Sequence, residues 1–353
     1  MAGAAVRPVV WSSVTQGRGL GRLILRGRSF LVFSALLFAP CEAMADWSAI
    51  AETKVLYTDN VFEHSSAKRM TVSEDPSQPT SVSVKKLGDF VWEPSLDVRH
   101  ISSPTNLGST EVSLKAQGAI FTDNPIFNHG NYRMQVKQTL DPETSLLLRY
   151  RYVPNLFLGH NNERRTGQRL EEEERVTSHI WRVQLERRLT ELFTATLVGR
   201  YGLRQFNEAF AERDTTFWTS GPQLEWAVNS WLRLTTIYLY ERGLADGRQE
   251  VEFKDDVSYR QHFASLGATA WVSPALSLTA GYGYRQKLFT SELVGDSHRG
   301  VVDTTHQGSA GLRYEVNPVA AITLGFQRTQ RSSTAAARDF LNTNTSLGLQ
   351  WQF

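Results

Sequence analysis

The sequence predicts an all-β protein: a transmembrane antiparallel up-and-down β-barrel of about fourteen strands, with twelve or sixteen strands as the alternatives. Three observations predict this fold class. Segments in which apolar and polar residues alternate recur from residue 46 to residue 353, and alternation with a period of two is typical of a strand with one oily face. The connections between these segments are alternately short and long. No run of about eighteen apolar residues occurs, so spanning helices are not expected.

The individual strands are predicted from the alternation and from the turn residues that separate them. The last one is the clearest, because Leu347, Leu349 and Trp351 share one face while Ser346, Gln350 and their polar neighbours share the other. The predicted strands are 47–62, 88–101, 109–121, 129–140, 144–154, 176–189, 192–205, 215–228, 231–242, 256–272, 275–290, 304–316, 319–331 and 341–353. An even number keeps both ends of the chain on one side of the membrane.

The turns predict the orientation of the barrel. Five tight connections begin with Asp, Thr, Asn or Ser, and three of them contain Pro, which suits tight-turn geometry. These turns are Asp141-Pro142-Glu143, Thr190-Glu191, Asn229-Ser230, Ser273-Pro274 and Asn317-Pro318. The connections on the opposite side are mostly longer and polar, and the two longest, 63–87 and 155–175, could fold inward as a constriction. Short turns on one side and long loops on the other are typical of membrane barrels.

Closure of the sheet is expected on physical grounds. In hydrocarbon every backbone N–H and C=O needs a partner, and a sheet provides them all only when its last strand pairs with its first. Segment 341–353 is therefore predicted to pair with 47–62. The alternative is a water-soluble β-sandwich, which also alternates, but its outward face is polar and its loops show no systematic asymmetry.

Residues 1–45 have a different composition and are predicted to be a cleaved secretory signal peptide, followed by the barrel at 46–353. Arginines stand unopposed before Glu42, residues 30–39 are apolar, and Ala43-Met44-Ala45 fits a small-x-small cleavage site. A mitochondrial transit peptide is the competing interpretation. The only cysteine, Cys41, lies in this leader, so the mature chain is expected to have no disulfide and no thiolate metal site.

The inward face is predicted to be rich in basic residues. Alternation places sixteen basic and eight acidic candidates there. The side chains predicted to line a pore are Arg133, Lys137, Arg149, Arg151, Arg182, Arg200, Arg204, Arg233, Arg285 and Arg313. One interpretation is structural, with arginines and carboxylates paired across strands to brace the wall. The other is functional, since unpaired guanidinium groups in a pore favour anions and bind carboxylate or phosphate.

No catalytic, cofactor or metal site is expected. The chain contains no GxSxG, HExxH, Walker or EF-hand pattern, and its eight histidines show no paired spacing. His179 stands next to Ser178, but alternation puts their side chains on opposite faces. The formal charge of +2 argues against a nucleic-acid partner. Aromatic residues near the strand ends, such as Trp226 and Trp351 at one end and Trp92 and Trp218 at the other, are predicted to form two girdles.

Two short stretches resemble known proteins. The terminal LQWQF, with Trp351 and Phe353, resembles the assembly signal of bacterial outer-membrane barrels. That resemblance implies a bacterial outer-membrane location, with barrel-assembly machinery, outer-membrane lipid and lipopolysaccharide as partners. The stretch Tyr57-Thr58-Asp59-Asn60-Val61-Phe62 is similar to a YxDNV(F/Y) stretch in the first strand of β-barrel porin families, some of which are linked to exopolysaccharide export.

The leading functional hypothesis is therefore an outer-membrane channel for passive passage of polar solutes, anions among them, through a basic lumen. The second is an outer-membrane component of an export system for an acidic exopolysaccharide, which needs periplasmic and inner-membrane partners. The third is a barrel that conducts nothing and acts as an enzyme or a surface scaffold. The sequence does not decide among the three, because one fold hosts many functions.

Overall fold

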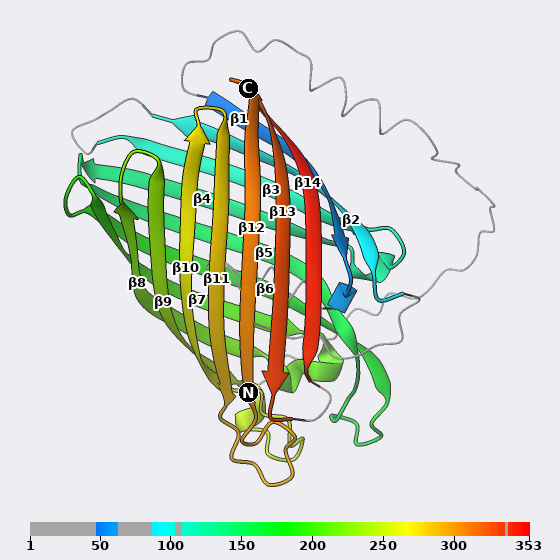
Figure 1. The fold of residues 1–353 in the computed structure, drawn as a ribbon. Helices are drawn as coiled ribbons and strands as arrows, with labels where there is room; N and C mark the ends of the chain where they lie inside the picture. Colours follow the sequence, from blue (N-terminus) through cyan, green and yellow to red (C-terminus); the bar gives the residue numbers. More distant parts are fainter. Residues whose placement is uncertain (1–46, 63–85, 103–107, 336–337) are drawn as a thin grey trace, which may run out of the picture. The chain divides into compact units, whose positions relative to one another are not determined.

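Fourteen antiparallel strands form one closed sheet in the computed structural model, which describes residues 47–62, 86–102, 108–335 and 338–353 (Figure 1). The strands are Trp47–Thr58 (β1), Asp89–Ile101 (β2), Thr110–Phe121 (β3), His129–Asp141 (β4), Thr144–Asn162 (β5), Glu171–Arg188 (β6), Phe193–Phe206 (β7), Thr215–Ala227 (β8), Leu232–Ala245 (β9), Tyr259–Ser273 (β10), Leu276–Phe289 (β11), Val302–Asn317 (β12), Ala320–Ser333 (β13) and Phe340–Gln352 (β14). This confirms the predicted fold class and strand number, and excludes the sandwich. The predicted leader, and the expected loop 63–87 apart from its last two residues, lie outside the described residues.

Each strand pairs with its sequence neighbours, and the last pairs with the first as expected. Along the seam β1 and β14 are antiparallel from Ile50 opposite Gln352 to Thr58 opposite Asn344. Phe353 extends this ladder, because its amide donates to Ala49 O at 2.8 Å and its carbonyl accepts from Ala49 N at 3.1 Å. In the part of the chain that the structure describes, the loops contain three short 3-10 helices: Pro125–Phe127 (η1), Glu208–Arg213 (η2) and Asp246–Arg248 (η3). None of the helices in the described ranges is long and apolar enough to cross a membrane.

The tight turns share one device, which explains why Asp, Asn, Ser and Thr begin them. In each turn the side chain of the first residue accepts a hydrogen bond from a backbone amide two residues further on, a local turn that these side chains favour. The acceptors are Asp141, Thr190, Asn229, Ser273 and Asn317, and the distances are 2.8, 3.2, 3.0, 3.3 and 2.9 Å. All five turns lie at the end of the barrel that carries Phe353, and the longer loops lie at the other end (Figure 1).

The prediction of a long loop at 155–175 is wrong. Pairing of β5 with β6 continues from Leu156 opposite Val176 to Asn162 opposite Glu171, interrupted by irregularities after Val153 and Phe157. Only 163–170 connects the two strands. The high charge of 171–175 suggested a loop, but a hairpin that extends into water can carry charged side chains on both faces without desolvation cost.

The end of β1 holds the seam together at the long-loop end. The side-chain amide of Asn342 donates to Thr58 Oγ1 at 2.9 Å, to Asp59 Oδ1 at 3.2 Å and to Asn60 O at 3.1 Å. Asp59 also accepts from the amide of Thr343 at 2.7 Å. Residues 58–60 belong to the stretch that is similar to the porin families, so in this chain that stretch fastens the two terminal strands. We call these contacts the seam clasp.

The lumen is filled unequally along its length, which the sequence did not predict. Four apolar clusters of buried residues occur in the described chain. The largest joins Leu56 and Val91 of the wall to Val61, Phe127 and Phe157 near the long-loop end. Inward side chains near the tight turns are more exposed, as for Arg233 at 46%. The half near the long loops is therefore packed, and the half near the tight turns contains both exposed inward side chains, such as Arg233, and buried ones, such as Thr196 and Val198.

Candidate functional site in the barrel lumen

The outward face of the closed sheet is apolar over a continuous band. Large apolar side chains such as Leu197, which is 60% exposed, cover it, whereas charged side chains such as Glu93 and Glu241 are buried inside at 1% exposure. This distribution is the reverse of that of a water-soluble protein and requires hydrocarbon around the barrel. Closed antiparallel barrels with such a band, tight turns at one end and longer loops at the other belong to the bacterial outer membrane. The chain is an outer-membrane β-barrel.

Ion pairs between strands that are adjacent or one strand apart brace the inside of this barrel. They join β1 to β2 (Lys54–Glu93, 2.7 Å), β2 to β3 (Arg99–Glu111, 3.2 Å), β2 to β4 (Arg133–Asp97, 2.7 Å), β4 to β6 (Lys137–Glu186, 3.3 Å), β7 to β9 (Arg200–Glu241, 3.5 Å; Arg204–Glu241, 3.7 Å) and β8 to β9 (Arg233–Glu225, 3.3 Å), and one lies within β12 (Arg313–Glu315, 2.7 Å). Among the described residues, the structural interpretation therefore accounts for at least eight of the sixteen basic candidates.

Basic residues also face one another directly in the sheet register. Arg149 of β5 lies opposite Arg182 of β6, and Arg182 lies opposite Arg200 of β7. A second row at the adjacent level joins Lys115, Arg133 and Arg151 of β3, β4 and β5. Like charges directly opposite each other on one face destabilise a sheet. We call these six residues the basic track; two of them, Arg133 and Arg200, also belong to the ion pairs above.

The guanidinium group of Arg149, in the basic track, is positioned by a neutral side chain. Its Nε and Nη2 both donate to Gln135 Oε1, at 2.9 and 2.7 Å. Among the described residues it forms no ion pair. An amide oxygen orients the guanidinium without neutralising it. Arg151 is oriented similarly, because its Nε donates to Asn131 Oδ1 at 2.8 Å.

A shared carboxylate marks the boundary with the packed half of the lumen. Glu241 pairs with both Arg200 and Arg204, and its Oε1 accepts from the hydroxyl of Tyr259 at 2.6 Å. Lys287 Nζ lies 4.3 Å from the centre of the Tyr259 ring, in a cation–π contact. Positive charge therefore outnumbers negative charge here as well.

A cavity of about 180 Å³ lies at the long-loop end, next to this cluster. Its lining contains five Lys or Arg side chains and His298, but only one carboxylate, that of Glu174. The basic lining residues are Arg164, Arg204, Arg213, Lys287 and Arg338. The cavity and the basic track thus share an excess of positive charge, in the two halves of the lumen.

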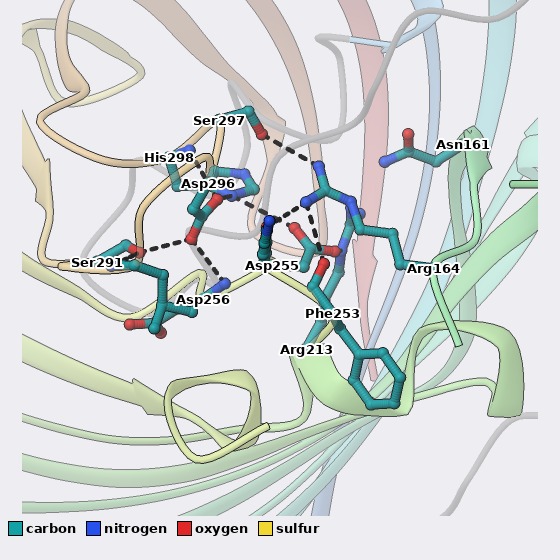
Figure 2. Close-up of polar contacts among 12 residues, drawn as sticks. Asn161, Arg164, Arg213, Phe253, Asp255, Asp256, Ser291, Asp296, Ser297 and His298 are labelled. Carbon is teal, nitrogen blue, oxygen red and sulfur yellow. Dashed lines mark hydrogen bonds and ion pairs between the residues drawn. The ribbon is translucent and has the colours of Figure 1, made fainter. Parts of the chain in front are cut away.

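Hydrogen bonds and ion pairs join four outer loops (Figure 2), and four residues of this network, Arg164, Arg213, Ser297 and His298, line the cavity. Arg164, in the connection between β5 and β6, donates to the backbone carbonyls of Phe253 and Lys254 and to Ser297 Oγ. Arg213 of η2 pairs with Asp255 at 2.6 Å and with Glu174 at 2.8 Å. Burial lowers the pKa of Arg213, but these two carboxylates more than compensate and raise it, so the guanidinium stays charged.

Asp296 organises the loop between β11 and β12. Its carboxylate accepts from Ser291 Oγ at 2.5 Å, from the amide of Asp256 at 2.9 Å and from the amide of His298 at 2.9 Å. Burial raises its pKa, but the hydrogen bonds from His298 and Ser291 prevail and hold that pKa at about 2. Asp255, Asp296 and His298 could in principle ligate a metal. Since Arg213 already neutralises Asp255, the cluster is explained by its own contacts.

The ten predicted pore-lining residues all occupy inward positions of the strands. Arg133, Lys137, Arg200, Arg204, Arg233 and Arg313 belong to the ion pairs above, and Arg149, Arg151 and Arg182 belong to the basic track. Arg285 lies at 2% exposure beside Thr305 in the packed half. Sequence reasoning missed Asp303, opposite Lys287 on β12, because the predicted strand began one residue later. It also missed the loop residues Arg164, Arg213 and Asp296, which no periodic pattern marks.

No protein-family model matches the sequence, and no curated protein does. Solved structures with a similar course of the chain include an anion-selective porin from Comamonas acidovorans (10% identity, TM-score 0.46, 87% of this chain and 98% of that chain). The outer-membrane channel DcaP of Acinetobacter baumannii is another (11%, 0.48, 87% and 96%), as is OmpT, an outer-membrane protein of Vibrio cholerae (8%, 0.48, 87% and 97%). At this level of similarity the comparison adds nothing to what the barrel itself shows.

Proposed function

We propose that the barrel is a narrow channel that passes small polar solutes and prefers anions. The observation that carries the proposal is the basic track. Its cations lie directly opposite one another in two rows, one across β5, β6 and β7 and the other across β3, β4 and β5. An anion that lies between guanidinium groups lowers their mutual repulsion, because Arg binds carboxylate and phosphate with paired hydrogen bonds.

The unequal filling of the lumen supports a path with two different halves. Solute enters a wet vestibule at the tight-turn end, where ion pairs such as Arg233–Glu225 remain half-exposed. It then meets the basic track, and beyond it the packed half with the cationic cavity. The loop network over the cavity acts as the constriction of this path. The sequence predicts that loop 155–175 could fold inward as a constriction. In the structure most of this segment belongs to the hairpin of β5 and β6, which extends the wall.

A second candidate function, a barrel that conducts nothing, is favoured by one specific observation. Apolar clusters occupy the lumen near the long loops, and Arg182 and Arg200 are only 7% and 9% exposed. A wall packed in this way also suits a scaffold for surface binding. The third hypothesis, export of an acidic polysaccharide, makes the same use of a basic track but needs a wider opening at the packed half.

The test is conductance of the purified, folded barrel in planar bilayers, with reversal potentials measured in a KCl gradient. Discrete conductance steps with a chloride-selective reversal potential support the proposal. A cation-selective pore contradicts the anion preference, and membranes that stay silent with correctly folded barrel support the non-conducting alternative. Blockade of the steps by an acidic oligosaccharide, but not by a neutral one of equal length, would favour the export function.

A further inference from the structure

Two arginines face each other on the outer surface of the barrel, outside the lumen. Arg242 of β9 lies opposite Arg260 of β10 in the sheet register. Both side chains are exposed, while the residues that alternate with them, Glu241 and Tyr259 among them, are buried inside. Partners in an antiparallel pair have Cα atoms about 5 Å apart, and like charges at that separation destabilise the sheet.

Nothing in the described part of the chain compensates this pair. Within residues 47–62, 86–102, 108–335 and 338–353, neither Arg242 nor Arg260 forms an ion pair, a side-chain hydrogen bond or a cation–π contact. Charged residues are expensive on the lipid face of a barrel in the middle of the bilayer and much less so near the interfaces. The position of the two arginines along the barrel axis therefore decides whether they face hydrocarbon or lipid headgroups.

Aromatic residues place the pair at the outer interface. Arg242 lies opposite Trp218 of β8, and Trp218 is eight positions along that strand from Trp226 at the tight-turn end. With a rise of about 3.3 Å per residue and a tilt of about 40°, eight residues span about 20 Å along the barrel axis, which is close to the thickness of the apolar band. Arg242 and Arg260 therefore lie where the hydrocarbon ends and the headgroups of the outer leaflet begin.

The neighbouring side chains fit this position. Two residues closer to the membrane centre on each strand, Tyr240 and His262 are register partners with ring centroids 5.3 Å apart. The Tyr238 hydroxyl lies 2.8 Å from His262 Nδ1. Amphipathic rings of this kind gather at the headgroup level. Further toward the centre, the outward face of β10 is apolar, with Ala264 and Leu266.

We propose that Arg242 and Arg260 bind a phosphate group of an outer-leaflet lipid, such as the sugar-linked phosphates of lipopolysaccharide. Two forked guanidinium groups offer paired donors to the oxygens of one phosphate. The phosphate removes the repulsion between them, and the acyl chains of the same molecule lie along the apolar face of β10 below. This site is on the outer surface and is independent of whether the lumen conducts.

The test uses the folded full-length barrel in nanodiscs with three probes: bisphosphorylated lipid A, dephosphorylated lipid A and inorganic phosphate. The variants are R242Q/R260Q and, as a matched control, R187Q, which removes an outward arginine at the tight-turn end of β6. Native mass spectrometry measures how much lipid A each variant retains. We expect the double variant to bind bisphosphorylated lipid A about a hundredfold more weakly than wild type, and R187Q to bind it normally.

Removal of the phosphates should weaken binding to wild type by a similar factor and leave the double variant unchanged. The variant R242K/R260K, which keeps the charge without the fork, should retain an intermediate affinity. Equal binding of phosphorylated and dephosphorylated lipid A by wild type would overturn the proposal, as would an equal loss in R187Q. Inorganic phosphate that displaces lipid A from wild type with an affinity equal to that of lipid A would also overturn the proposal, since the site would then recognise the free ion.

Discussion

Replacement of Arg182 by Gln tests the electrostatic role of the basic track, because Arg182 is its central member between Arg149 and Arg200. An anion that passes about 5 Å from a unit charge in water gains about 0.8 kcal/mol, and at 0.1 M salt screening reduces this to about 0.5 kcal/mol. This energy raises the local anion concentration about 2.3-fold and lowers that of cations equally. R182Q should therefore lower the chloride-to-potassium permeability ratio about fivefold.

The assay is the reversal potential of single channels in a KCl gradient, and salt concentration provides an internal check. At 1 M salt the Debye length falls to about 3 Å, so the same substitution should change the permeability ratio less than twofold. R187Q is the matched control, since Arg187 is on the same strand but its side chain points outward. An open channel whose reversal potential is the same in R182Q and in wild type would refute the electrostatic reasoning.

The loop network and the seam give three further predictions. R213M leaves the buried carboxylates of Glu174 and Asp255 without their shared cation, which destabilises the loop network by about 3 to 5 kcal/mol. Trypsin should therefore cut the outer loops of the folded variant much faster than those of wild type. The pKa of Asp296 is about 2, below its ordinary 3.8. The stabilisation that ionised Asp296 gives to the loop is therefore complete above about pH 4 and is lost as the pH falls to 2. Hydrogen exchange, corrected for intrinsic rates, should show 290–301 loosening over that window, and D296N should abolish the pH dependence. N342A removes the donor of three seam-clasp hydrogen bonds, whose acceptors keep other partners, at a cost of about 0.5 to 1.5 kcal/mol for each bond. The heat-induced mobility shift on gels should therefore occur at lower temperature, and an unchanged shift would contradict the assigned role of the clasp.

The fold was predictable because the membrane imposes a strict pattern on every strand. Tight turns such as Asn229-Ser230 and Asn317-Pro318 have a local cause, the side chain that accepts a backbone hydrogen bond, so single residues mark them. Strand alternation placed the lumen cations on the inward face for the same reason. The extension of β5 and β6 was missed because beyond the bilayer the apolar pattern ends while hydrogen-bonded pairing continues.

The site was only partly predictable, because register and loop contacts decide it. Alternation assigns Arg149, Arg182 and Arg200 to one face, but only the pairing register places them side by side. A shift of one strand by two residues would keep the face and separate the charges. The contact of Arg164 with the Phe253 segment joins residues about ninety positions apart, and no periodic signal precedes it.

The seam clasp sets an order of events for assembly. Its hydrogen bonds connect residues 284 positions apart in the chain, so the ring cannot be completed until nearly all of the polypeptide has been delivered. Until then the first strand has one unprotected edge in an environment that penalises it. Closure of the seam is therefore the step that removes the last free edges of the sheet.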